Sequence, residues 1–193
     1  MFLIPVFLCS VFGNTKTHDY KKEVKTYLRG LKYLSSDFVQ TNSEGAVYSG
    51  HIYIAKEKTK KVRVDYEESI RQKIVIKGDI ITITDLDSKE KTQHSVKQTP
   101  IYDVLSDNIE LDERNCSVNN LGTEYIEVVI CEIVPSGKVY VSLIFSRYSN
   151  GNVKNLEGWV IKEANDQKTE VSFFPDSLSV NDKSKIPNAV FEE

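Results

Sequence analysis

The sequence contains few of the residues that catalysis and metal binding usually need. Its 193 residues include three histidines and three cysteines. His18, His51 and His94 lie far apart, and none has metal-ligand spacing around it. The GxSxG, HExxH and CxxC patterns are absent, as is a glycine loop that could cradle phosphate. These absences argue against an enzyme, and we expect neither a metal nor a cofactor.

Two groupings remain as catalytic alternatives. Cys116 could act as a nucleophile with His94 as its base, and Asp85 with Asp87 resembles a pair of catalytic carboxylates. Asp85 and Asp87 fall in an expected turn, however, where aspartate is favoured because it hydrogen-bonds to the local backbone. We therefore interpret both groupings as structural.

The chain also lacks a strong charge of either sign. Lys and Arg number 25 against 28 Asp and Glu, so the formal net charge is −3. No basic stripe with interleaved aromatic residues is present, and we expect no nucleic-acid partner. The densest positive run is KEKTKK at 56–61, which we interpret as a solvated turn. Contact with a membrane or an acidic partner is the alternative.

Long hydrophobic runs are missing except at the start. Residues 1–13, MFLIPVFLCSVFG, carry no charge but are too short to cross a bilayer, which takes about 20 apolar residues. We predict a signal peptide over 1–13, cut before Asn14, and a single exported domain over 14–193 that is a monomer. Leu8 stands before Cys9, where a lipid-attachment signal needs a small residue, so we expect no lipid anchor.

The other two cysteines leave two alternatives open. In an oxidising compartment a Cys116–Cys131 disulfide would close a loop of about 15 residues, which stabilises by roughly 3 kcal/mol. A hairpin turning near 119–122 would instead place Cys116 nearer Ile126 than Cys131, and both would be free thiols.

The most regular feature is alternation between apolar and polar residues, typical of strands with one apolar face. In KVRVDYEESIRQKIVIKGDIITITD, residues 61–85, it is almost unbroken. It predicts strands near 37–41, 46–55, 61–67, 72–77, 80–85, 91–96, 115–119, 123–131, 138–146, 152–162 and 168–174. Helical spacing predicts a first helix over 19–34, and Thr99-Pro100 predicts a short helix through IYDVL.

About eleven strands in meander order predict a mainly β (α+β) fold. A sheet of this size must curl, so we expect an incomplete, strongly curved antiparallel β-barrel with helices as covers. The side chains expected on its inner face are Ile52, Ile54, Val62, Val64, Tyr66, Ile74, Ile76, Ile81, Ile83, Val141, Leu143 and Phe145. They could form a solid core or line an apolar cavity.

The order of short motifs resembles that of the outer-membrane lipoprotein carrier proteins, the LolA family. These motifs are DFVQT (37–41), SGHIYIAKEKTKKVRVDY (49–66), VIKGDIITITDLD (75–87), TPIYDVL (99–105), GWVIKEANDQKTEVSFF (158–174) and IPNAVFEE (186–193). The positions that fit the family pattern are Phe38, Gln40, Gly50, Ile52, Ile54, Arg63 and Tyr66. The resemblance spans about residues 20 to 193.

The resemblance implies an incomplete β-barrel with a helical lid over an apolar cavity, and a periplasmic carrier of acylated lipoproteins from the inner to the outer membrane. The implied partners are an inner-membrane ATP-driven transporter that loads the carrier, and an outer-membrane receptor or the membrane itself. Lys56 stands where the family has an arginine that locks the lid, so we expect Lys56 to take that role with fewer hydrogen bonds. Val62 and Val64 replace aromatic residues of the family.

Three other interpretations stay open. The first is a lipid- or lipoprotein-binding receptor or sensor of the same fold. The second is a small hydrolase, which would need an acid or nucleophile on the inner face, where the sequence predicts aliphatic residues. The third is a structural β-domain with a solid core.

Overall fold

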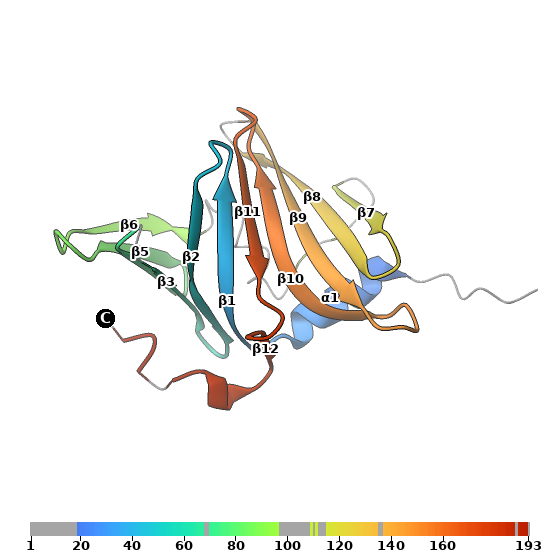
Figure 1. Ribbon diagram of the computed structural model, residues 1–193, viewed down its shortest axis with the longest axis horizontal. Coiled ribbons are helices and arrows are strands. Elements are labelled where there is room, and N and C mark those ends of the chain that lie inside the picture. Colours follow the sequence, from blue (N-terminus) through green and yellow to red (C-terminus); the bar gives the residue numbers. More distant parts are fainter. Residues whose placement is uncertain are drawn as a thin grey trace, which may run out of the picture.

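The computed structural model describes residues 19–67, 70–96, 109, 111, 115–134, 137–187 and 189–192. The expected signal peptide over 1–13 and the expected helix of TPIYDVL lie outside the described residues. Within them the chain forms one large antiparallel sheet, one α-helix and one turn of 3-10 helix. The predicted mainly β fold with an open, curled sheet is confirmed (Figure 1).

Most neighbouring elements are joined by short turns, but β6 ends at Ser95 and β7 begins only at Cys116. The helices are α1 (Tyr20–Gly30) and η2 (Lys183–Lys185). The strands are β1 (Tyr33–Asn42), β2 (Val47–Lys56), β3 (Lys60–Tyr66), β4 (Gln72–Lys77), β5 (Ile80–Asp85), β6 (Lys91–Ser95), β7 (Cys116–Leu121), β8 (Tyr125–Val134), β9 (Gly137–Arg147), β10 (Val153–Lys162), β11 (Lys168–Phe173) and β12 (Ser179–Val180).

Two meanders make up the sheet. The strand order is β6-β5-β4-β3-β2-β1-β11-β10-β9-β8-β7, so neighbours in space are neighbours in sequence except at β1–β11. There Phe38 pairs with Phe173, while the short β12 pairs with β1 at Leu34 and Ser35. Strands β6 and β7 are the two ends of the sheet and do not pair with each other.

The first helix ends earlier than its apolar spacing predicted. Asp19 caps α1 by accepting a hydrogen bond from the Lys22 amide at 3.1 Å, and the helix ends at Gly30. Leu34, expected in the helix, is extended and pairs with Ile54. The prediction of helix to residue 34 was wrong because leucines at helical spacing continue into a strand whose inner face is also apolar.

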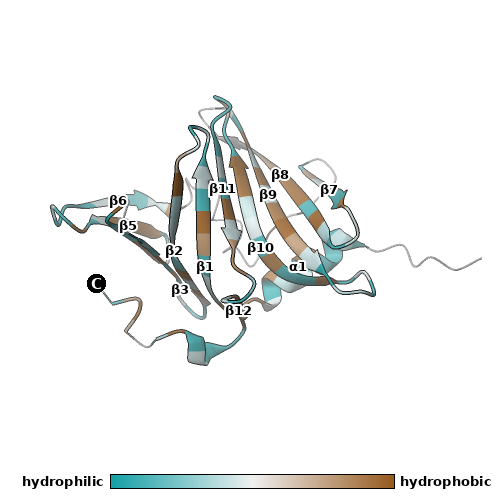
Figure 2. Ribbon diagram, in the orientation of Figure 1, coloured by the Kyte–Doolittle hydropathy of each residue, from teal (hydrophilic) through white to brown (hydrophobic). Residues whose placement is uncertain are grey.

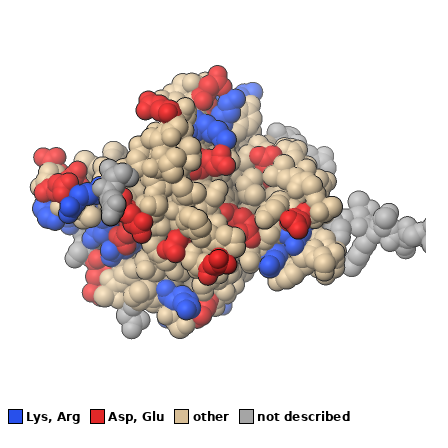
Figure 3. Space-filling model, in the orientation of Figure 1, with Lys and Arg blue, Asp and Glu red and all other residues tan. Residues whose placement is uncertain are grey.

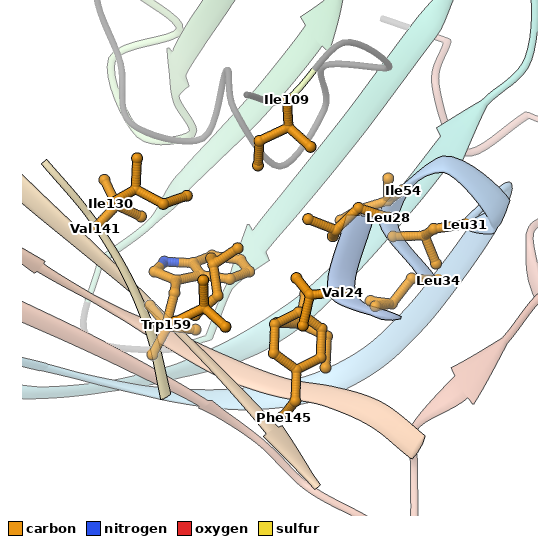
Figure 4. Close-up of a cluster of buried hydrophobic side chains, with 14 of the residues drawn as sticks. Val24, Leu28, Leu31, Leu34, Ile54, Ile109, Ile130, Val141, Phe145 and Trp159 are labelled. Atoms are coloured by element: carbon orange, nitrogen blue, oxygen red, sulfur yellow. The ribbon is translucent and has the colours of Figure 1, made fainter. Parts of the chain in front are cut away.

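The hydrophobic core lies on the inner face of the sheet, the face that packs against α1. Strands of both meanders carry hydrophobic residues interspersed with polar ones (Figure 2), and the buried hydrophobic side chains form one large cluster. Val24 and Leu28 of α1 are fully buried against this face, and Phe145 and Trp159 belong to the same cluster (Figure 4).

The opposite, outer face carries a smaller apolar cluster made by the end of the chain. Val190 and Phe191 are buried with Ala55, and Tyr33 and Tyr53 pack against them. Arg63 Nη1 donates to the Val190 carbonyl at 2.8 Å, which fixes this segment over β3. Elsewhere acidic and basic side chains are interspersed on the face shown in Figure 3.

Candidate functional site

The twelve side chains predicted for the inner face do lie on one face of the structure. All of them belong to the main hydrophobic cluster or pack against it. Eight are buried, and Val64, Tyr66, Ile74 and Ile83 are partly buried. They come from β2 to β5 and from β9, so they line both meanders. Strand alternation was sufficient to identify them because each residue step turns the side chain to the other face.

A small pocket opens on this face beside Trp159. Its volume is about 40 Å³, and its lining includes Phe38, Ile52, Val64 and Tyr66. That is room for a water molecule or two and far less than an acyl chain fills. An acyl chain could enter this pocket only if the side chains that line it moved.

Aromatic packing shapes the pocket. Phe38 and Tyr66 meet edge to face with ring centroids 5.5 Å apart, and Trp159 meets Phe173 in the same way at 5.3 Å. The Tyr66 hydroxyl donates to Gln40 Oε1 at 2.8 Å, which satisfies the polar group. Burial raises the pKa of Tyr66, so it remains a neutral donor at physiological pH.

Helix α1 covers the inner face and is held to the far meander by polar contacts along its length. The contacts are Arg147 Nη1 to the Tyr20 hydroxyl at 2.8 Å, Lys21 Nζ to the Cys116 carbonyl at 2.8 Å, the Val153 amide to Glu23 Oε2 at 2.9 Å, and the Leu156 amide to the Tyr27 hydroxyl at 3.1 Å. Tyr20, Lys21 and Glu23 lie in the first turn of α1 and Tyr27 lies further along it. Their partners belong to β7, β9 and β10.

Lys56 connects the other side of α1 to β2. Its side chain is 9 % exposed, and Nζ donates to the Leu28 carbonyl at 2.9 Å. Leu28 lies in the last turn of α1, where carbonyls have no partner within the helix and the helix dipole favours a cation. Lys56 thus contacts the covering helix α1. That Lys56 locks this cover in place stays a prediction.

The two cysteines are free thiols in the structure, so the disulfide alternative is not what the structure shows. The β7–β8 hairpin turns at residues 122–124, slightly later than the predicted 119–122, and Cys116 pairs with Ile130. Cys131 is the next residue along β8, so its side chain points to the opposite face of the sheet.

The catalytic alternatives from the sequence are not brought together. Cys116 lies on β7 and His94 on β6, the two opposite ends of the sheet, so this pairing is wrong. Asp85 accepts hydrogen bonds from the Asp87 and Ser88 amides, which lower the pKa of its carboxyl group. It is a turn residue, as expected. Among the described residues, no group of three or more potential ligands could hold a metal ion.

One grouping on the outer face escaped the sequence analysis. Ser35 Oγ lies 2.8 Å from His51 Nε2, and His51 Nδ1 lies 2.6 Å from Asp37 Oδ1. The β1–β2 register brings them together, because Asp37 pairs with His51. A hairpin register drawn from the Asn42–Gly45 turn could have found this group.

This Ser-His-Asp contact has the order of a hydrolytic triad but not its surroundings. Ser35 is only 6 % exposed, and β1 is paired at Ser35 with both β2 and β12. The amides on either side are therefore used in the sheet, where an oxyanion would need unpaired donors. We interpret the contact as a polar link between β1 and β2.

An open, curled antiparallel sheet with an apolar inner face under a helix defines a binding fold. The family model of the outer membrane lipoprotein carrier protein LolA matches residues 29–192, and the chain belongs to this family. LolA proteins are periplasmic and carry or bind lipids and lipoproteins. In the part of the chain that the structure describes, no helix has the length and hydropathy to cross a membrane.

The solved structures to which the chain is similar share little sequence with it. A LolA superfamily protein from Nitrosomonas europaea is 11 % identical, with 90 % of this chain and 97 % of that chain covered and a TM-score of 0.46. The chain is also similar to MucB in the Pseudomonas aeruginosa MucA/MucB complex, with 12 % identity, 89 % of this chain and 60 % of that chain covered, and a TM-score of 0.46. For the structure of MucB alone the identity is 11 %, the coverage is 89 % of this chain and 62 % of that chain, and the TM-score is 0.47. The chain thus spans about 60 % of the MucB chains. No curated protein sequence matches it.

Proposed function

We propose that the protein is a periplasmic carrier that takes acylated lipoproteins from the inner to the outer membrane. The acyl chains bind against the inner face of the sheet after α1 has moved away. An inner-membrane ATP-driven transporter loads the carrier, and an outer-membrane receptor or the membrane itself unloads it. The observation that supports this most is the inner face itself, which is apolar across both meanders and is covered by α1, a helix that polar contacts hold to the sheet.

The energetics of such a carrier are finely balanced. Each CH₂ of an acyl chain gains about 0.8 kcal/mol on leaving water, but a bilayer offers the chain the same gain. Transfer between carrier and bilayer is therefore close to neutral, and the small cost of opening the cover decides its direction. The contacts of α1 contribute about 1 kcal/mol each, and those to charged groups about 1.5–3 kcal/mol.

Replacing Lys56 tests this balance. Lys56→Leu removes the donor to the Leu28 carbonyl and adds apolar surface, so the closed, empty form loses about 1.5–3 kcal/mol relative to the loaded form. We expect cargo to be retained at least about tenfold more strongly and delivered correspondingly more slowly. The measurement is the rate at which purified, loaded carrier transfers a lipoprotein to vesicles.

Lys138→Leu is the matched control, because Lys138 is exposed at the start of β9 and makes the same change in charge and size. Its transfer rate should equal that of the unaltered protein. If Lys56→Leu also delivers at the unaltered rate, Lys56 has no part in holding the cover.

The carrier function is tested most directly by native mass spectrometry of residues 14–193 recovered gently from a bacterial periplasm. We expect a population with one acylated lipoprotein bound per carrier. A protein that is always empty, and that takes no lipoprotein from loaded vesicles, would overturn the proposal and favour a sensor or a structural domain of the same fold.

A further inference from the structure

Folding brings lysines from distant parts of the chain close to the positively charged β2–β3 turn. The run at 56–61 contains four lysines, and folding adds residues from distant parts of the chain. Lys32, just after α1, accepts a hydrogen bond from the Lys56 amide at 2.7 Å through its carbonyl. Lys183 of η2 reaches Glu57 at 3.0 Å. The start of β1, the β2–β3 turn and β12 lie at the same lower rim of the sheet in Figure 1.

A pocket of about 520 Å³ opens between these segments; we call it the lysine pocket. Its lining includes Lys32, Lys56, Lys58 and Lys61, and the one carboxylate of the lining is Glu57. The lining thus contains four lysines and one carboxylate, in a protein whose formal net charge is −3. The local excess of positive charge favours an anionic ligand.

Glu57 offsets only part of the positive charge of this pocket. Its carboxylate accepts hydrogen bonds from the Tyr33 hydroxyl and from Lys183 Nζ, and these contacts lower the pKa of Glu57. The carboxylate is thus ionised and paired with Lys183, which lies outside the pocket lining. Asp182, the other carboxylate at this rim, is occupied by Ser184.

A second pocket, of about 130 Å³, adjoins the lysine pocket. It shares Tyr33, Glu57 and Lys61 with the lysine pocket and adds one more lysine together with apolar residues: Lys183, Ala55, Ile186, Pro187 and Phe191. Cationic side chains beside apolar ones suit a phospholipid, which joins an anionic phosphate to apolar acyl chains, better than they suit a free phosphate ion.

Lys56 belongs to both the lysine pocket and the cover. It lines the pocket, and its buried Nζ donates to the Leu28 carbonyl in the last turn of α1. A phosphate in the pocket would compete for this ammonium group, because a hydrogen bond between two charged groups is stronger than one to a neutral carbonyl. Helix α1 would then lose its contact with β2.

We propose that the lysine pocket binds the phosphate of anionic phospholipids at a membrane surface, and that this binding draws Lys56 away from Leu28 and loosens α1. Contact with a membrane thereby opens the cover where cargo is exchanged. This inference rests on the proposed carrier function, whose opening step it explains.

Binding is tested by sedimentation of the purified protein with vesicles. We expect it to sediment with vesicles of phosphatidylglycerol and phosphatidylcholine but not with pure phosphatidylcholine, and to be released as salt rises from about 50 to 200 mM. Lys32→Glu combined with Lys58→Glu should weaken binding at least tenfold. The control, Lys89→Glu with Lys138→Glu, makes the same charge change at exposed lysines elsewhere and should bind normally. Equal binding by both double variants would overturn the site.

Opening is tested by amide hydrogen exchange of α1. Exchange in residues 24–30 should become at least tenfold faster with anionic vesicles, unchanged with phosphatidylcholine vesicles and unchanged with inorganic phosphate. Lys56→Leu should bind anionic vesicles with no further change in α1. Binding without faster exchange would overturn the coupling, and an equal response to inorganic phosphate would overturn the assignment to lipid.

These experiments contain no lipoprotein, so they separate the two proposals. A protein that carries lipoprotein in the native mass spectrum but ignores anionic vesicles refutes this inference alone. One that binds anionic vesicles and opens, yet never holds lipoprotein, refutes the carrier function.

Discussion

Gly50 shows how one residue sets the shape of the inner face. It pairs with Phe38 on β1 and Tyr66 on β3, and the Phe38 ring lies against it. A Cβ at this position would stand 2.3 Å from the Asp65 carbonyl oxygen and 2.9 Å from Phe38 Cζ. The glycine therefore allows the backbone and an aromatic ring to approach more closely than any side chain permits.

We expect Gly50→Ala to lower the free energy of unfolding by about 1–3 kcal/mol, because the backbone contact cannot relax without bending the strand. Urea titration measures the change. Gly30→Ala is the control: nothing lies within 4 Å of a Cβ there, so the change should be neutral or slightly stabilising. Equal effects of the two substitutions would contradict the crowding at Gly50.

At the residue scale, the alternation of apolar residues was a good guide to the side of the sheet on which each side chain lies. Ile52 and Ile54 required only a period of two. The contact of Ser35 with His51 could not be predicted in the same way, because it depends on the register between two strands. The neighbours of Lys56 also depend on the third dimension: Lys32 and Lys183 reach the same turn only when the chain has folded.

At the element scale, α1 is bound to the sheet by groups whose protonation matters. Burial raises the pKa of Tyr27, against the opposing effect of the hydrogen bond from the Leu156 amide. The folded protein therefore keeps this proton at pH values where the unfolded chain, with a tyrosine pKa of 10.0, has lost it. The stabilisation is complete below pH 10 and is lost as pH rises through the folded-state pKa.

We expect the free energy of unfolding to fall above about pH 10, and to fall less steeply in Tyr27→Phe, which has no proton to lose at this site. Urea titrations at a series of pH values from 8 to 11 measure both slopes. At pH 8 the variant should already be about 1–3 kcal/mol less stable, because the Leu156 amide loses its acceptor. If the free energy of unfolding fell equally steeply above pH 10 in both proteins, Tyr27 would ionise equally in the folded and unfolded states.

The elements themselves were predicted better than their ends. All eleven longer strands lie close to the ranges that alternation indicated, since each has one apolar face. The end of α1 was missed because Leu31 and Leu34 satisfy helical spacing although pairing with β2 places Leu34 in a strand. The two-residue β12 has no periodicity to detect, and only its pairing with Leu34 and Ser35 defines it.

At the scale of the whole molecule, the two faces of the sheet carry separate apolar clusters. The inner cluster includes α1, whereas the outer one consists of Ala55, Val190 and Phe191 with their neighbours. Phe191 also lies 5.7 Å below Lys61 Nζ, in a cation–π contact. The outer cluster stabilises the β1–β3 region without contributing to the inner face.

We expect Phe191→Ala to lower the free energy of unfolding by roughly 3 kcal/mol while binding of an apolar fluorescent probe to the folded protein stays unchanged. Thermal unfolding and probe titration measure the two quantities. The control is Phe174→Ala, whose side chain is 48 % exposed and should matter by less than about 0.5 kcal/mol. Weaker probe binding in Phe191→Ala would mean that the probe occupies the outer face.

The single ladder between β1 and β11 has a consequence for the time course of folding. Every other long ladder joins strands that are adjacent in the chain, so each meander can form through short loops. The pairing of Phe38 with Phe173 must close most of the polypeptide at once, and long-range closure of this kind slows folding. The pairings within the two meanders should therefore gain hydrogen-exchange protection first, and the amides that join β1 to β11 last, since this ladder turns two separate ribbons into one sheet.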